Sequence, residues 1–195
     1  MILKELVGLM DIGCKVLRTY YEGLTICELG DQRMKWHPDK TGKKYLLNLG
    51  VKEHISLDWN KKNGALKRDL SKPVDEWQSY FDMVTNFGTT EHINNGQYDV
   101  FKNIHNFVKV GGVMVHALPL VGHWKRHCKY HYEEDFPETL STINGYECVL
   151  SEIRVIKGRA GQNQPMVCAV LKKTSDKEFA SEEEFKNMNK IAGLK

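Results

Sequence analysis

The stretch that most constrains the fold runs from residue 81 to residue 93, because it predicts a buried strand leading through a polar loop into a helix. The apolar run that begins it is interrupted at residues 86–88, a mixture of small and polar side chains. Thr89 or Thr90 then offers a helix cap, with Glu91 in the first turn. In open α/β sheets, ligands bind where parallel strands end in such loops.

Strands and helices alternate along the rest of the chain, a pattern typical of a mostly parallel sheet. The predicted helices are residues 2–21, 44–49, 98–108 and 135–144, and one that begins at Ser181. The predicted strands are residues 25–30, 54–58, 65–70, 81–85, 113–119, 148–156 and 166–172. The last two strands must be antiparallel, because the segment between them is too short for a parallel crossover. We therefore predict a doubly wound, mostly parallel, seven-stranded Rossmann-like α/β sheet with a C-terminal antiparallel hairpin.

The 195 residues suffice for one domain with a full core. We expect that core at residues 24–173, after an N-terminal helix and before a tail at residues 174–195. A formal net charge of +3 is too small to indicate nucleic acid binding by itself. Five scattered cysteines without a CxxC pair indicate reduced thiols, which favours a cytoplasmic protein. We expect neither a signal peptide nor a membrane span.

Three acids fall at or near the ends of three successive predicted strands: Glu28, Asp58 and Asp69. These ends share one edge of a doubly wound sheet, so the three carboxylates are expected to line one crevice. A single acid in such a place is as often a helix cap or a solvated loop residue. The prediction therefore depends on finding all three acids at the ends of successive strands. Among them, Asp58 at the end of the second strand is placed to accept hydrogen bonds from the two hydroxyls of a ribose.

The loop after the first strand contains one glycine, Gly30, which lets the backbone approach a ligand closely. Residues 31–34 are Asp-Gln-Arg-Met, where a GxGxxG pattern would have its further glycines. This argues against the pyrophosphate cradle of a nicotinamide or flavin dinucleotide. If no cofactor binds, Gln32, Arg33 and Met34 are the first candidates for side chains that fill the pocket there.

In their order along the chain, six segments resemble the class I S-adenosylmethionine-dependent methyltransferases of the small, type 11/12-like kind. The segments are residues 26–30, 55–58, 67–70, 81–87, 91–93 and 110–114. The resemblance covers roughly residues 24–173, and its specificity lies in the ordered set rather than in any one motif. It implies S-adenosyl-L-methionine as cofactor, S-adenosyl-L-homocysteine as product, and transfer of a methyl group to an acceptor.

The resemblance also implies which residues bind the cofactor. Glu28 and Gly30 would border its methionine moiety. Asn86, Phe87 and Gly88 would form the floor beside the sulfonium.

For the adenosine part, the resemblance implies that Asp58 holds the ribose hydroxyls and that Trp59 packs on the adenine. Asp69 would accept a hydrogen bond from the adenine amino group. Leu70 would donate a backbone N–H nearby.

Methyl transfer is a displacement at an activated sulfonium, so the protein mainly aligns the acceptor and sometimes removes a proton. The candidate bases are His92, His116 and His123. His116 lies within a predicted strand and is more simply a core histidine. We predict His92 and His123 as the catalytic residues, with a packing or capping role as the alternative for His92.

His123, His127 and His131 are spaced four residues apart, and on a helix their imidazoles would share one face. One option for this segment is therefore a zinc or iron site. The segment lacks an acid in a known metal-ligand pattern. The preferred interpretation is a loop or short helix that covers the site and contacts the acceptor.

A divalent metal at Glu91 and His92 is a second option. Some methyltransferases that this chain resembles have E-x-x-E-H there, but Gly88 stands in place of the first Glu. No metal is therefore predicted.

Basic and aromatic side chains mix in residues 35–45 and 124–132, which suits RNA or a phosphorylated acceptor as well as a solvated loop. We favour a small molecule or a saccharide as the acceptor over nucleic acid. The alternative is a vestigial methyltransferase fold that serves as a binding or regulatory module, suggested by the missing glycines. Another Rossmann-like nucleotide-binding enzyme is least favoured, because no phosphate loop is present.

Overall fold

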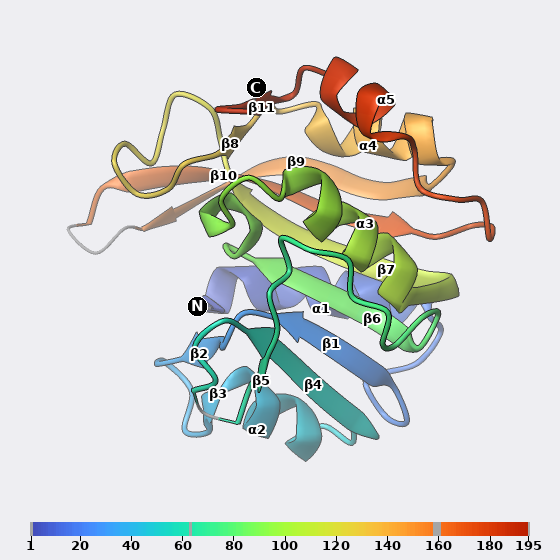
Figure 1. Cartoon of the computed structure of the whole chain (residues 1–195). Coiled ribbons are helices and arrows are strands. Elements are labelled where there is room, and N and C mark those ends of the chain that lie inside the picture. The colour runs from blue at the N-terminus through green and yellow to red at the C-terminus, as the bar shows by residue number, and fades with distance from the viewer. Residues whose placement is uncertain (1, 63, 158–160, 195) are drawn as a thin grey trace.

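The computed structural model describes residues 2–62, 64–157 and 161–194. A central seven-stranded sheet has the strand order β5-β4-β1-β6-β7-β10-β9 (Figure 1). Its strands are β1 (Thr25–Leu29), β4 (Glu53–Asp58), β5 (Leu66–Lys67), β6 (Phe81–Phe87), β7 (Val108–Pro119), β9 (Glu147–Lys157) and β10 (Asn163–Lys172). Strand β10 is antiparallel to β7 and β9, and the other neighbouring strands are parallel. The predicted Rossmann-like sheet with its terminal hairpin is confirmed.

Two small antiparallel pairs lie outside this sheet. Strand β2 (Arg33–Met34) pairs with β3 (Lys40–Thr41), which folds the loop after β1 back on itself. Strand β8 (His131–Tyr132) pairs with β11 (Ile191–Ala192), which attaches the C-terminal segment to the histidine-rich segment.

Helices cover both faces of the sheet. One face packs against α1 (Lys4–Val16) and α2 (Gly42–Asn48). The other packs against α3 (Gln97–Phe107), α4 (Phe136–Asn144) and α5 (Glu182–Asn187). Successive strand residues point to opposite faces, so each strand contributes to two hydrophobic clusters. Continuous apolar runs are expected where both faces of a strand are covered.

Two predicted boundaries move because backbone pairing continues past them. Strand β6 extends to Phe87 rather than Thr85, because Asn86 and Phe87 remain paired with β7. Strand β7 begins at Val108 rather than Val113, with a shift in register around Gly111 and Gly112. The left-handed φ of +85° at Gly111 allows this irregularity.

One predicted helix is shorter in the structure, and one expected helix start is a single turn. Helix α1 ends at Val16 instead of residue 21, and Arg18 and Tyr21 then take left-handed φ values. The hydroxyl of buried Tyr21 donates to Asp11 Oδ1 at 2.8 Å, which fixes this turn against α1. After β6, the expected helix start is only the 3-10 turn η1 (Thr90–His92), and α3 begins at Gln97.

Cys14, Cys27 and Cys168 are buried free thiols. Within the described part of the chain, no helix has both the length and the apolar character that a membrane span requires.

His116 of β7 is a buried core residue whose ionisation should make stability depend on pH. Its Nδ1 accepts a hydrogen bond from Asn86 Nδ2 at 3.3 Å, and burial lowers the pKa of His116 to about 4. As the pH falls, the unfolded chain takes up this proton near pH 6.5, whereas the folded chain takes it up only near pH 4. We therefore expect the free energy of unfolding to fall as the pH drops from about 6.5 towards 4, by up to about 1.4 kcal/mol per pH unit from this residue.

Urea unfolding at pH 7 and pH 5 measures this dependence. The His116→Gln variant should lose less stability between the two pH values than the wild type. His123→Gln changes an exposed residue and serves as the control. Equal losses in all three proteins would contradict the prediction.

Candidate ligand-binding site

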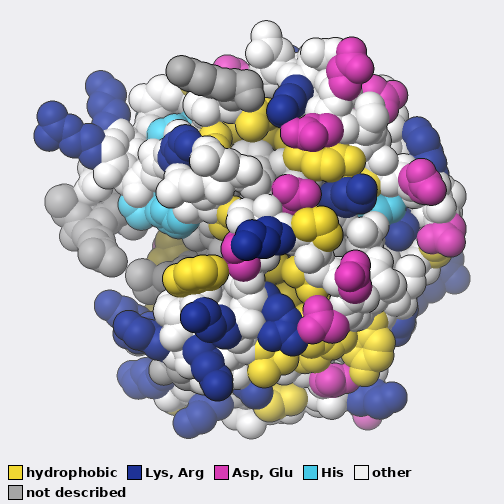
Figure 2. All heavy atoms as spheres, in the orientation of Figure 1, with side chains coloured by type: hydrophobic (Ala, Val, Ile, Leu, Met, Phe, Trp, Pro, Cys, Tyr) yellow, Lys and Arg dark blue, Asp and Glu magenta, His cyan; other side chains and the backbone are white. Residues whose placement is uncertain are grey.

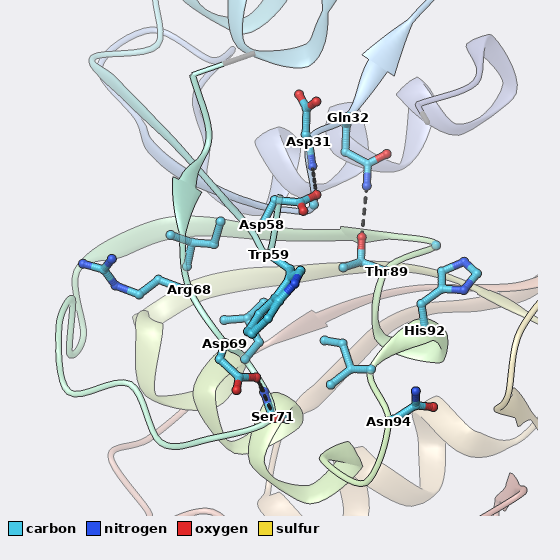
Figure 3. A pocket seen from close by; sticks show the side chains of 15 residues that line it. Asp31, Gln32, Asp58, Trp59, Arg68, Asp69, Ser71, Thr89, His92 and Asn94 are labelled. Atoms are coloured by element: carbon cyan, nitrogen blue, oxygen red, sulfur yellow. Dashed lines mark hydrogen bonds between the residues drawn. The ribbon is translucent and has the colours of Figure 1, made fainter. Parts of the chain in front are cut away.

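A cleft of about 580 Å³ opens at the carboxyl ends of the parallel strands. It lies where the strand order reverses, because β1 leads towards β4 and β5 while β6 leads towards β7 on the other side. Such a switch point is the usual ligand site of an open α/β sheet. The predicted site residues that line it are Gly30, Asp58, Trp59, Asp69, Leu70, Gly88 and His92. Figure 3 labels Asp58, Trp59, Asp69 and His92 among them. Those that do not line it are Glu28, Asn86, Phe87 and His123.

The carboxylate of Asp58 joins two loops at the edge of this cleft. Its Oδ2 accepts a hydrogen bond from the Asp31 N–H at 2.8 Å, and its Oδ1 accepts from the Asn60 N–H at 2.8 Å. A carboxylate oxygen has a second lone pair, so both oxygens can still accept from a ligand. Asp58 is thus oriented by the backbone before any ligand binds.

Trp59 lies between Asp58 and Asp69 in the cleft (Figure 3) and is 63% exposed, which is unusual for so large an apolar ring. Asp69 Oδ1 accepts from the Ser71 hydroxyl at 2.6 Å and from the Ser71 N–H at 3.1 Å. The Ser71 hydroxyl is the main reason that the pKa of Asp69 lies below its usual range. The cleft therefore offers a flat aromatic surface between two carboxylates, which suits a heterocycle that carries hydrogen-bond donors.

The side chain of Gln32 bridges the ends of β1 and β6. Its Nε2 lies 2.9 Å from the Leu29 carbonyl oxygen, 3.1 Å from the Phe87 carbonyl oxygen and 3.1 Å from Thr89 Oγ1. A primary amide has two N–H donors for these three acceptors. The two strand ends thus form a subsite for a nitrogen group with several N–H donors, and Gln32 supplies that group here. The sequence had indicated Gln32, but nothing in it indicated which atoms the amide would contact.

Gly30 makes this close approach of the loops possible. Its φ is +83°, and a Cβ at this position would lie 2.6 Å from Thr89 Oγ1 and 2.9 Å from Gln32 Nε2. Any other residue would push the loops after β1 and β6 apart.

Glu28 supports the cleft from behind. The carboxylate is buried, and its Oε1 accepts from the Gln32 N–H at 3.1 Å and from Ser56 Oγ at 3.1 Å. Its Oε2 faces Gly42, where a Cβ would collide with it, and lies 3.6 Å from His54 Nε2. Glu28 therefore holds the loop after β1 in its conformation without facing the cleft.

Asn86 has a similar supporting role beneath the loop after β6. Its Oδ1 accepts from the Thr90 N–H at 3.3 Å, and its Nδ2 donates to Thr90 Oγ1 at 3.0 Å. Asn86 is fully buried, so it fixes the η1 turn from the sheet side.

A second cavity of about 490 Å³ adjoins the first. Gly88 and His92 line both cavities and mark the place where they meet. The second cavity lies between the start of α1, the η1 turn, the segment that precedes β8, and the β9–β10 hairpin. Phe87 is also among its lining residues. Residues 121–130 form a loop, one of the two forms expected from the sequence, and His131 lies in β8. His123 is exposed and lines neither cavity.

Burial alters two ionisable groups at this junction. It raises the pKa of Glu91 to about 7. It also lowers the pKa of His92, and the neighbouring His127 lowers it further. His92 Nε2 lies 3.7 Å from Glu91 Oε1.

No family model matches the sequence, and no curated protein matches it. Solved structures do match. A Burkholderia thailandensis 1,6-didemethyltoxoflavin-N1-methyltransferase, solved with 1,6-didemethyltoxoflavin and S-adenosylhomocysteine bound, superposes with a TM-score of 0.61 at 14% identity, over 87% of this chain and 79% of that one.

Two further matches are S-adenosylmethionine-dependent methyltransferases. The one from Methanosarcina mazei has a TM-score of 0.55 at 10% identity, over 82% of this chain and 94% of that one. The one from Thermotoga maritima has a TM-score of 0.53 at 10% identity, over 87% of this chain and 97% of that one. At such identities the likeness shows the fold: the chain has the Rossmann-like fold of the class I S-adenosylmethionine-dependent methyltransferases.

The packing at Gly30 can be tested against a second glycine with a similar backbone. Gly23 has a φ of +77°, but a Cβ there would meet nothing within 4 Å. We expect Gly23→Ala to lower the free energy of unfolding by about 1 kcal/mol through backbone strain alone. Gly30→Ala should lower it clearly more, because it adds a collision with Thr89. Urea unfolding of both variants measures the difference, and equal losses would contradict the tight approach at Gly30.

Proposed function

We propose that the chain is an S-adenosyl-L-methionine-dependent methyltransferase acting on a small-molecule acceptor. The observation that carries the proposal is the cleft at the switch point, where Asp58 and Asp69 flank the exposed ring of Trp59. These are the groups that an adenosine requires: acceptors for its ribose hydroxyls and amino group, and a flat surface for its base. The S-adenosylhomocysteine bound to the Burkholderia thailandensis enzyme supports the same choice of ligand.

The residues present fit the adenosine part of this cofactor. Asp58 would hold the ribose hydroxyls, Trp59 would pack on the adenine, and Asp69 would accept from the adenine amino group. The buried Leu70 adds an apolar contact and its backbone N–H. When bound, the cofactor supplies a methyl group on a sulfonium, which is activated for displacement.

At the methionine end of the cleft, the groups that could contact the cofactor are backbone groups rather than charged side chains. Gly30 and Gly88 leave room beside the loops after β1 and β6, and the Leu29 and Phe87 carbonyl oxygens can accept from an ammonium group. The amide of Gln32 now uses both oxygens. Binding of the methionine moiety therefore requires this side chain to move.

The acceptor would enter the second cavity, whose volume of about 490 Å³ suits a small molecule. Lys125 and Arg126 line this cavity, which favours an acceptor that carries a negative charge. His92 lies where the two cavities meet, so it is the residue placed to take a proton from the acceptor. A catalytic role for His123 stays a prediction without support from its position.

The alternative function is a binding or regulatory module in which the cofactor site is vestigial. One observation favours it, namely the three short contacts of the Gln32 amide at the methionine end. In that case the cleft would not admit the cofactor, and the fold would serve a partner instead.

Calorimetric titration with S-adenosylmethionine and S-adenosylhomocysteine, with NADH as the control ligand, tests the proposal. We expect the first two to bind and Asp58→Ala to weaken them by about tenfold or more, since it removes the acceptor of the ribose hydroxyls. Asp75→Ala changes an exposed acid outside the cleft and should leave the affinity unchanged. Unchanged binding by Asp58→Ala would remove its ribose role, and no binding by the wild type would favour the vestigial module.

The obstruction by Gln32 leads to a separate prediction. Gln32→Ala should raise the affinity for S-adenosylmethionine by about three- to tenfold, because the free protein no longer has to release the amide from its acceptors. Arg33→Ala alters the exposed neighbour, which lies outside the cleft, and is the matched control in the same titration. A loss of affinity in Gln32→Ala would instead show that the amide contributes to binding.

A further inference from the structure

Glu91, His92 and His127 form a compact group of potential metal ligands at the border of the two cavities. Each offers one ligand atom, and the three atoms all lie within 4.8 Å of one another. The rings of His92 and His127 have their centroids 5.0 Å apart. The η1 turn supplies two of these side chains, and the loop at residues 121–130 supplies the third. Figure 2 shows histidine side chains at the surface on the side where Figure 1 places the segment before β8.

Glu91 provides an independent observation that points to a ligand. This side chain is 2% exposed, and its Oε2 has no hydrogen-bond partner among the described residues. Its Oε1 lies 3.7 Å from His92 Nε2, which is longer than a hydrogen bond. A carboxylate buried in this way is unfavourable unless it is paired or coordinates a metal.

The two segments that supply the ligands are held together by several contacts. The Tyr130 N–H donates to the Glu91 carbonyl oxygen at 3.3 Å. Lys129 Nζ donates to Asn95 Oδ1 at 2.9 Å, and the Asn95 N–H donates to the Tyr130 hydroxyl at 3.1 Å. The position of His127 relative to η1 is thus set by the fold, as a preorganised site requires.

We propose that Glu91, His92 and His127 bind a divalent first-row transition-metal ion. Two imidazoles and one carboxylate suit Zn²⁺, Mn²⁺, Fe²⁺ or Co²⁺, whereas Mg²⁺ and Ca²⁺ favour sites made of oxygen ligands. Three protein ligands leave coordination positions open, as in catalytic rather than structural sites.

The proposal differs from the sequence-based prediction of no metal. That prediction depended on the E-x-x-E-H pattern, in which Gly88 replaces a Glu. In the structure, the third potential ligand beside Glu91 and His92 is His127. From the sequence, His127 was considered together with His123 and His131, because the three are spaced four residues apart.

The open positions would face the second cavity, which Glu91, His92 and His127 all line. An acceptor with a hydroxyl or carboxylate oxygen could then complete the coordination. With the metal bound, His92 would serve as a ligand instead of the proton acceptor named above, because its lone pair would be on the metal. This last role rests on the proposed methyl transfer, whereas the metal site itself does not.

The full chain, freed of metal with a chelator and dialysed, should bind Zn²⁺ with a stoichiometry of one in a calorimetric titration. Co²⁺ in place of Zn²⁺ should give visible absorption bands that report imidazole and carboxylate ligation. His127→Ala and Glu91→Gln should each weaken Zn²⁺ binding by about tenfold or more. His123→Ala removes an exposed histidine of the same loop and should bind Zn²⁺ as the wild type does. Circular dichroism verifies that each variant is folded.

Absence of one-to-one Zn²⁺ binding, or equal binding by all the variants, would overturn the metal site. These titrations contain no S-adenosylmethionine, and the cofactor titrations are done with chelator present. Zn²⁺ binding by a chain that does not bind the cofactor would support the metal site and contradict the proposed methyltransferase. Cofactor binding by a chain that does not bind Zn²⁺ would support the proposed methyltransferase and contradict the metal site.

Discussion

The reversal of strand order between β1 and β6 is the constraint on which the rest of the molecule depends. The connections after these two adjacent strands lead in opposite directions, so neither covers their carboxyl ends. The carbonyl oxygens of Leu29 and Phe87 are left facing a gap, and backbone oxygens in such a place require a donor. The amide of Gln32 meets this requirement from within the chain.

The fold was largely predictable because its signals are local and periodic. Strands buried on both faces read as apolar runs, and the short link between β9 and β10 permits only an antiparallel pair. Boundaries were less predictable where tertiary contacts override local preference. Asn86 breaks an apolar run in the sequence, yet it stays in β6 because its side chain is satisfied by Thr90 beneath the η1 turn.

The site was predictable only as far as backbone register determines it. Asp58 and Asp69 reach the cleft because the ends of neighbouring parallel strands meet at one edge. Glu28 points to the same face of the sheet as Asp58, but it pairs with Ser56 and so lies two positions further from the strand ends. The loop after β1 closes over its carboxylate, which accepts from the Gln32 N–H and fits against Gly42. Side chains on irregular loops have no periodicity to indicate their direction, which is why His127 beside Glu91 could not be foreseen.

The position of Gln32 has a consequence for the rate at which a ligand enters the cleft. A ligand group that needs the Leu29 and Phe87 oxygens can bind only after the amide has left them. Association would then proceed in two steps, and its observed rate would level off at high ligand concentration at the rate at which the side chain departs. The rate of ligand entry would then be set by how quickly the Gln32 amide leaves its three acceptors at the ends of β1 and β6.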